Sequence, residues 1–259
     1  MRLSDIASAV APYLSADGRL IRLPQHRTIV FVGDTHGDLD ATERVLSRHL
    51  RPDRTIVFLG DAVDRGPDSV GNLKLILKAK LDHPTSIHLL MGNHEAWAVA
   101  RFSPADFWSS LDSEASSNLA GTLRQLPYAA WHPTGVLGLH GALPDGIELS
   151  GFESIELGSE RWRSITWGDW SEQASVEGRP GVCGRPLFGR REFIARSARL
   201  GATVLVRSHQ PTAPTYLFDD RCLTLFTTNA YGVGPRSIAL LRPGRTIRTA
   251  RDLEIEVID

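Results

Sequence analysis

The segment GDTHG (33–37) places two side chains that can bind metals one residue apart, Asp34 and His36. Carboxylate oxygens and imidazole nitrogens both coordinate first-row divalent cations. The segment follows an apolar run, so both side chains would leave the end of one strand together. Taken alone, the aspartate could serve only as a helix cap and the histidine only as a core residue. The other polar segments of the chain decide between these interpretations.

Further segments of the same character follow along the chain: GDAVDRG (60–66), GNHE (92–95), HG (140–141) and RSHQ (207–210). Asp61 follows Asp34 by 27 residues and Asn93 follows Asp61 by 32, about one strand–helix repeat each. The side chains that could surround a pair of divalent cations such as Mn, Fe or Zn are Asp34, His36, Asp61, Asn93, His140 and His209. Two cations about 4 Å apart need a bridging carboxylate, and Asp61 lies in the middle of the set.

The hydrophobic pattern predicts the elements that position these side chains. Apolar runs that end in a turn indicate buried strands at 28–34, 54–61 and 86–93. Apolar residues at helical spacing predict helices at 1–14, 39–50, 68–81 and 190–200, and we expect another helix to begin near Glu95. The alternation of strand and helix favours parallel strands whose carboxyl ends face one crevice.

The second half of the chain has a different pattern. Short β-type runs separated by turn residues predict a mostly antiparallel sheet, with strands at 135–140, 203–207, 215–218, 222–227, 236–241 and 245–257. Residues 101–126 have an irregular helical pattern, and 145–162 and 171–189 are expected to be loops. We therefore predict an α/β (α+β) fold of two packed sheets flanked by helices. It forms a single domain, 1–259, in which an insert at about 101–130 could cap the cleft.

These five segments, in this order, resemble the phosphoprotein phosphatase (PPP) superfamily of calcineurin-like metallophosphoesterases. The resemblance extends from about residue 28 to residue 241 and implies a four-layer fold with two mixed sheets. Met91 stands where eukaryotic members carry Arg, and TTNAYG (227–232) replaces their SAPNYC segment. These departures make the chain similar to bacterial-type members.

The resemblance also implies roles for individual residues. Asp34 and His36 would bind the first metal, Asp61 would bridge both metals, and Asn93, His140 and His209 would complete the second. A hydroxide held between the two metals, with Mn²⁺ preferred and Fe or Zn as alternatives, would attack phosphorus in line. His94 would be the general acid, held by Asp64, and Arg65 would bind the phosphate through a bidentate fork.

The second phosphate-binding arginine of the family falls in EGRPGVCGRPLFGRR (177–191). Arg185 and Arg179 both qualify, and Arg185 is preferred. Arg207 and Tyr231 also match family positions near the site. Asp38 and Asp40 are interpreted as residues of a helix start, and the tryptophans at 162, 167 and 170 as packing residues that could instead form an aromatic rim.

Two functions remain open after the resemblance is considered. The first is hydrolysis of phosphoserine, phosphothreonine or phosphotyrosine in proteins. The second is hydrolysis of nucleotides or of polyphosphates of the diadenosine tetraphosphate type by the same site. A phosphodiesterase or nuclease is disfavoured, since Pro211 stands where such enzymes carry a second histidine. A non-catalytic scaffold is disfavoured because every expected ligand is present.

Composition limits the partners and the compartment. The formal net charge is -1, so no basic signature for nucleic acid exists, and 42% hydrophobic and 23% charged residues are ordinary for a globular protein. No apolar run approaches the ~18 residues that span a bilayer, and the N-terminal segment lacks the pattern of a signal peptide. Cys183 and Cys222 have no CxxC spacing and are expected to be reduced. We expect a cytoplasmic protein with a phosphoprotein or small phosphorylated substrate and with no membrane or nucleic-acid partner.

Overall fold

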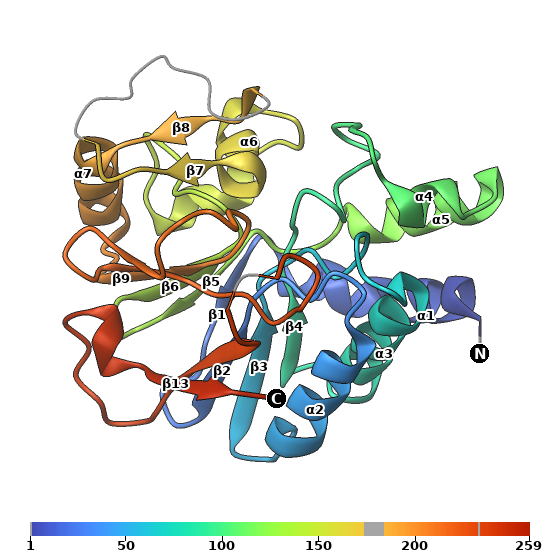
Figure 1. Cartoon of the computed structure of the whole chain (residues 1–259), viewed down its shortest axis with the longest axis horizontal. Coiled ribbons are helices and arrows are strands. Elements are labelled where there is room, and N and C mark those ends of the chain that lie inside the picture. The colour runs from blue at the N-terminus through green and yellow to red at the C-terminus, as the bar shows by residue number, and fades with distance from the viewer. Residues whose placement is uncertain (1, 174–183, 233) are drawn as a thin grey trace.

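The computed structural model describes residues 2–173, 184–232 and 234–259, and its two large sheets pack face to face (Figure 1). The five-stranded sheet has the order β13-β12-β2-β3-β4, and the six-stranded sheet has the order β1-β5-β6-β9-β11-β10. A small pair, β7-β8, lies beside α6 and α7. Helices α1, α2 and α3 cover the outer face of the five-stranded sheet (Figure 1). Two mixed sheets flanked by helices confirm the predicted fold class.

The strands are β1 (Leu20–Arg22), β2 (Thr28–Val32), β3 (Arg54–Phe58), β4 (Ile87–Leu89), β5 (Ala129–His132), β6 (Val136–Leu139), β7 (Asp169–Trp170), β8 (Leu187–Phe188), β9 (Val204–Arg207), β10 (Tyr216–Leu217), β11 (Cys222–Thr224), β12 (Ser237–Leu241) and β13 (Glu254–Val257). The helices are α1 (Leu3–Asp17), α2 (Leu39–His49), α3 (Ser69–Asp82), α4 (Asp106–Ser109), α5 (Ser113–Leu123), α6 (Glu160–Trp167) and α7 (Arg190–Leu200), with 3₁₀ helices at Leu149–Ser154 and Ala250–Asp252. No helix in these described ranges is long and apolar enough to cross a membrane.

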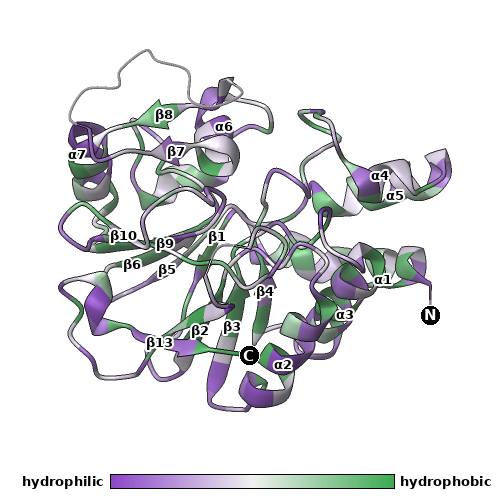
Figure 2. Ribbon diagram, in the orientation of Figure 1, coloured by the Kyte–Doolittle hydropathy of each residue, from purple (hydrophilic) through white to green (hydrophobic). Residues whose placement is uncertain are grey.

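The continuous apolar runs arise because the five-stranded sheet is buried on both faces. In β2, Ile29 and Phe31 pack into the layer between the two sheets, whereas Val30 and Val32 pack against the helices. Alternate residues of a strand point to opposite faces, so a strand covered on both sides has no polar position. Figure 2 shows the same contrast, with hydrophobic strands inside and mixed hydropathy on the helices. Strands β2, β3 and β4 are parallel, as the strand–helix alternation predicts.

Some predictions about individual elements are wrong. The six-stranded sheet is mixed rather than mostly antiparallel, because β1 pairs with β5, and β9 pairs with β6 and β11, in parallel. Residues after Glu95 form turns, and the next helix begins only at Asp106. Segment 245–257 forms a strand only from Glu254, and α6 begins inside the predicted loop 145–162. The irregular helical segment 101–126 contains α4 and α5, as expected.

Candidate active site and metal centre

The polar segments of the sequence meet where the two sheets adjoin. Asp34, Asp61 and Asn93 follow β2, β3 and β4 of the five-stranded sheet, and His140 and His209 follow β6 and β9 of the six-stranded sheet. Asp34 also forms a parallel β-bridge with Phe226, which joins the first segment to the end of β11. The carboxyl ends of parallel strands lie at the same edge, so the sheets bring side chains distant in sequence to one place.

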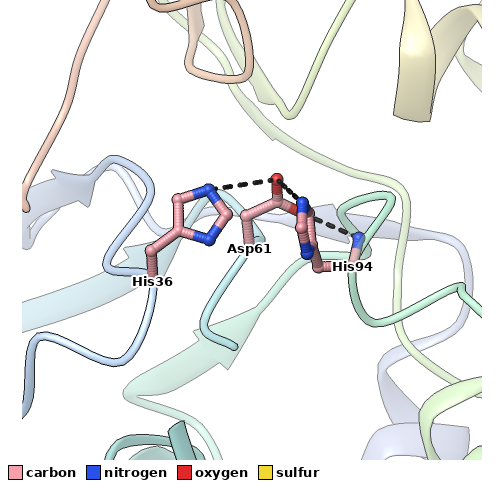
Figure 3. Close-up of side chains that lie close together, drawn as sticks. All are labelled: His36, Asp61 and His94. Atoms are coloured by element: carbon pink, nitrogen blue, oxygen red, sulfur yellow. Dashed lines mark hydrogen bonds and ion pairs between the residues drawn. The ribbon is translucent and has the colours of Figure 1, made fainter. Parts of the chain in front are cut away.

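Asp61 belongs to both groups of potential metal ligands that the described residues form. The first group contains His36, Asp61 and His94, and the second contains Asp61, His140 and His209. Asp61 Oδ2 lies 3.7 Å from His36 Nε2 and 3.3 Å from His140 Nε2. Figure 3 shows the imidazoles of His36 and His94 on either side of the Asp61 carboxylate. A carboxylate in this position can serve two cations.

The remaining predicted ligands lie beside these two groups. Asp34 Oδ2 is 3.7 Å from His36 Nε2, and Asp34 Oδ1 is 3.5 Å from His140 Nδ1. His140 Nε2 lies 3.2 Å from Asn93 Oδ1 and 3.1 Å from His209 Nδ1. The structure thus brings together all six side chains that the sequence singled out as ligands.

Two buried polar atoms test whether this donor set fits a cation. Asp34 Oδ1 and His209 Nε2 have no hydrogen-bond partner among the described residues. A buried polar atom without a partner destabilises a fold unless something satisfies it, and cations commonly do so at functional sites. Carboxylate, amide and imidazole ligands suit first-row divalent cations. The residues therefore fit a metal centre.

The charges of the site support the same conclusion. Burial, and next the nearby Asp61 carboxylate, raise the pKa of Asp34 to about 7. Burial alone would lower the pKa of His140, but the carboxylates of Asp61 and Asp34 raise it to about 9. Burial alone would raise the pKa of Asp61, but His140 and His94 hold it well below its ordinary value. Protons on His140 and Asp34 therefore offset charge that divalent cations would otherwise neutralise.

His94 and Asp64 form a close buried pair next to the ligands. His94 Nδ1 lies 2.6 Å from Asp64 Oδ2, while His94 Nε2 lies 3.8 Å from Asp61 Oδ2. Residues of the segment after GNHE hold the pair in place. Phe107 N–H donates to Asp64 Oδ1 (2.7 Å), and Trp108 Nε1–H donates to the His94 carbonyl (2.8 Å). The pairing leaves Nε2 as the ring nitrogen of His94 that can meet a substrate.

Glu95 is a functional residue to which the sequence reasoning assigned no role. Its carboxylate accepts hydrogen bonds from the backbone N–H groups of Asp61 (2.8 Å), Ala62 (2.8 Å) and Gly92 (3.0 Å). It therefore fixes the backbone of two ligand segments at once. Its place directly after the Asn-His pair was the signal available in the sequence.

The backbone of the site is held in unusual conformations. Positive φ angles between 41° and 73° occur at His36, Asp61, Asp64, Arg65 and His209. Such angles are costly for residues other than glycine and accumulate at functional sites. The glycines of the motifs allow neighbouring segments of the backbone to approach each other closely. A Cβ on Gly60 would lie 2.6 Å from Gly92 N, and one on Gly92 would lie 2.2 Å from Asp61 Oδ1.

The residues predicted to bind phosphate fall into two groups. Arg65 stacks over the ring of Tyr231 (5.2 Å to the centroid), whose hydroxyl lies 2.6 Å from His36 Nε2. Arg185 lies 3.8 Å from Asp169 Oδ1, and Asp169 in turn lies 3.7 Å from His209 Nε2. Arg65, Tyr231 and Arg185 are thus close to the ligands.

Arg207 has different surroundings. Its side chain is fully buried, and its guanidinium donates to Gln210 Oε1 (2.9 Å) and to the Gly168 carbonyl (3.4 Å). These contacts favour a structural role over phosphate binding. Arg179 and Cys183 lie outside the described residues.

The acidic residues after the first motif have structural contacts. Asp38 caps α2 by accepting from Ala41 N–H (3.1 Å), and Asp40 pairs with Arg44 and Arg236. The expected helix-start role is confirmed for both. Trp162 and Trp170 are buried in the core, whereas Trp167 is half-buried beside His209.

Comparison with known proteins places the chain among phosphoesterases. Residues 27–213 match the family model of the calcineurin-like phosphoesterases. A probable serine/threonine-protein phosphatase of Encephalitozoon cuniculi is 29% identical over 83% of the chain, and phosphatase BSL2 of Arabidopsis thaliana is 25% identical over 95%. The chain spans half of the first relative and about a quarter (26%) of the second.

Solved structures confirm the fold. A protein serine/threonine phosphatase from Saccharomyces cerevisiae superimposes with a TM-score of 0.82, at 22% identity, covering 98% of this chain and 88% of that one. A candidate diadenosine tetraphosphatase superimposes with a TM-score of 0.58, at 21% identity, covering 93% and 98%. The family match extends over more than half of the chain and includes the segments that carry the six ligands and His94. The chain therefore belongs to the calcineurin-like phosphoesterase family.

Proposed function

We propose that the chain is a metal-dependent phosphomonoesterase that removes phosphate from phosphoserine and phosphothreonine in proteins, and that also acts on phosphotyrosine. The observation that supports it most is the position of the Asp61 carboxylate, which lies close to His36, His140 and His209 and next to the His94–Asp64 pair. A carboxylate among such ligands can bridge two cations, and an acid beside it can protonate a leaving oxygen.

The proposed division of labour follows from the contacts. When bound, two divalent cations, for which we propose Mn²⁺, would act as Lewis acids that lower the pKa of water and offset charge on the phosphoryl oxygens. Asp34, His36, Asp61, Asn93, His140 and His209 would hold them. His94 donates a proton from Nε2 to the leaving oxygen, and Asp64 keeps the imidazole oriented through Nδ1.

We assign phosphate binding to the arginines near the predicted metal ligands. The guanidinium of Arg65 lies over the ring of Tyr231, which favours a position close to the predicted ligands. A planar fork can donate two hydrogen bonds to one phosphate group, a geometry that lysine cannot copy. Arg185 lies beside Asp169, which in turn is close to His209, and is the second candidate for phosphate binding.

The proposed substrate class is based on relatives whose activity is named. Serine/threonine-protein phosphatases match most of this chain, at 29% and 25% identity. The candidate diadenosine tetraphosphatase has the same fold and supports a nucleotide-directed hydrolase as the second candidate function.

One comparison of substrates tests the proposal. The Mn²⁺-loaded protein is assayed with a phosphoserine peptide and with diadenosine tetraphosphate, and kcat/KM is measured for each. We expect a higher kcat/KM for the peptide, and loss of turnover when a chelator removes the metal. A strong preference for the dinucleotide would instead establish the second function.

A further inference from the structure

A row of aromatic side chains adjoins His94 and has no role in the proposed chemistry. The ring of Phe102 lies edge-to-face against the imidazole of His94, with centroids 4.7 Å apart at an angle of 72°. Trp167 follows, 5.2 Å from Phe102 at 82°, and then approaches the ring of His209 at 6.1 Å. Phe102 and Trp167 are half-buried, so each keeps part of its ring exposed. We call these two residues the aromatic wall.

The aromatic wall extends from Arg185 to His94. Arg185, a candidate phosphate ligand, lies over Trp167 at 5.8 Å from the ring centroid. At the other end, Phe102 contacts His94, the proposed donor to the leaving oxygen. A leaving group attached to that oxygen must lie close to His94. It therefore lies within reach of the rings that contact the same imidazole.

The backbone of Phe102 is held by a hydrogen bond from a neighbouring tryptophan. The Phe102 carbonyl accepts from Trp97 Nε1–H at 3.0 Å, and the ring of Trp97 stacks on Trp108 at 5.4 Å and 16°. Trp108 donates to the carbonyl of His94. The backbones of Phe102 and His94 are therefore joined through Trp97 and Trp108. A preorganised surface binds a rigid partner with little loss of entropy.

We propose that Phe102 and Trp167 determine specificity by contacting an aromatic leaving group, so that the site accepts phosphotyrosine at least as well as phosphoserine in proteins. The inference rests on the proposed phosphoprotein phosphatase function. In phosphotyrosine the ring is bonded directly to the leaving oxygen, whereas phosphoserine offers only one methylene. Aromatic rings pair edge-to-face or offset, and such a pair changes a rate or binding constant by up to about tenfold.

The test uses two peptides of identical sequence that differ only in phosphotyrosine or phosphoserine. The ratio of their kcat/KM values is measured for the wild type, Phe102→Leu and Trp167→Leu. Phenolic and alkyl esters differ in intrinsic reactivity, but that difference is the same for every variant and cancels when the ratios are compared. We expect a wild-type ratio of one or more, and a fall of about three- to tenfold in each leucine variant.

Two control variants separate recognition from folding. Phe102→Tyr keeps a ring in place and should keep the wild-type ratio. Tyr216→Leu removes a half-buried aromatic of β10, remote from the ligands, and should leave both kcat/KM values unchanged. The melting temperature and the metal content of each variant show whether the fold is intact.

The outcomes distinguish this inference from the function on which it rests. A wild-type ratio below about one tenth, or an unchanged ratio in both leucine variants, overturns the role of the aromatic wall and leaves the phosphatase function standing. Failure to hydrolyse either peptide, while diadenosine tetraphosphate is cleaved, overturns both.

Discussion

At the scale of single residues, the pair His94–Asp64 carries the most specific chemistry of the site. The carboxylate engages Nδ1 of the imidazole, and backbone and indole N–H groups hold both residues from behind. Such a pair is suited to proton donation at Nε2. Both residues are buried, so the contacts that hold them lie inside the protein.

Replacement of His94 tests proton donation directly. In His94→Asn we expect kcat on a phosphoserine peptide to fall at least about a hundredfold, because a general acid contributes about 10²–10⁴-fold. The loss on p-nitrophenyl phosphate should be clearly smaller, because p-nitrophenolate is a weak base that leaves without a proton. Both kcat values are measured with metal content as a check, and exposed His26→Asn is the control. Equal losses on the two substrates would contradict a role as acid.

At the scale of elements, the three parallel strands and their turns assemble most of the site. Each turn contains a glycine whose missing side chain lets a neighbouring strand end approach. Gly92 is the clearest case, since it lies against both the backbone N and the carboxylate of Asp61.

A methyl group at this position should therefore disturb the metal centre. In Gly92→Ala the Cβ would lie 2.2 Å from Asp61 Oδ1, so Asp61 must move. We expect metal content to drop, kcat to fall more than about tenfold, and stability to fall by about 1–3 kcal/mol through overpacking. Metal analysis and urea unfolding measure these changes.

Gly121→Ala is the matched control. Gly121 lies inside α5, and a Cβ there would meet nothing within 4 Å. This variant should keep its metal and gain about 0.5–1 kcal/mol, since alanine favours helices over glycine. Normal metal binding by Gly92→Ala would show that the close approach has no functional importance.

The sequence predicted the elements around the ligands better than those elsewhere, for a physical reason. The continuous apolar run TIVFV is typical of a strand buried on both faces, so it predicts the strand clearly. A glycine followed by a predicted ligand then marks where each of these strands ends. Strands β1, β5, β7 and β8 were missed because they have two to four residues and little pattern. The pairing directions of the six-stranded sheet, the contacts of Glu95 with Asp61 and Ala62, and the contact of Arg207 with Gly168 depend on segments far apart in the chain. Local pattern carries no information about them.

At the scale of the whole molecule, the candidate metal centre lies where the two sheets adjoin. Asp34, Asp61 and Asn93 extend from one sheet, and His140 and His209 extend from the other. A cation held by side chains of both sheets would bind only the folded arrangement. Binding would therefore stabilise the entire protein, by about 2.7 kcal/mol at a hundredfold excess over Kd.

This linkage gives a prediction for pH. The pKa of His140, about 9, exceeds its ordinary value near 6.5, so the folded metal-free protein holds a proton that the unfolded chain releases. The resulting stabilisation is complete below about pH 6.5 and is lost as pH rises to about 9. The pKa of Asp34 is raised from 3.8 to about 7 and acts in the same direction, but mainly below this range, between about pH 4 and pH 7. Metal binding improves over the same range because the ligands lose their protons.

We therefore expect the difference in melting temperature between Mn²⁺-loaded and chelated protein to widen from pH 6.5 to pH 9. Thermal unfolding at several pH values measures it. His140→Asn should remove most of the pH dependence of the chelated protein. A gap that narrows as pH rises would contradict the assigned protonation of the site.

The distance in sequence between the ligands also has a consequence for how the protein is made. The His209 backbone N–H donates to Asp34 Oδ2 across 175 positions of the chain. Loop closure of this length comes late, because non-local contacts cost chain entropy before they contribute stability. A nascent chain that has not yet formed β9 therefore lacks a complete centre. The proposed activity would thus begin only once the fold is complete.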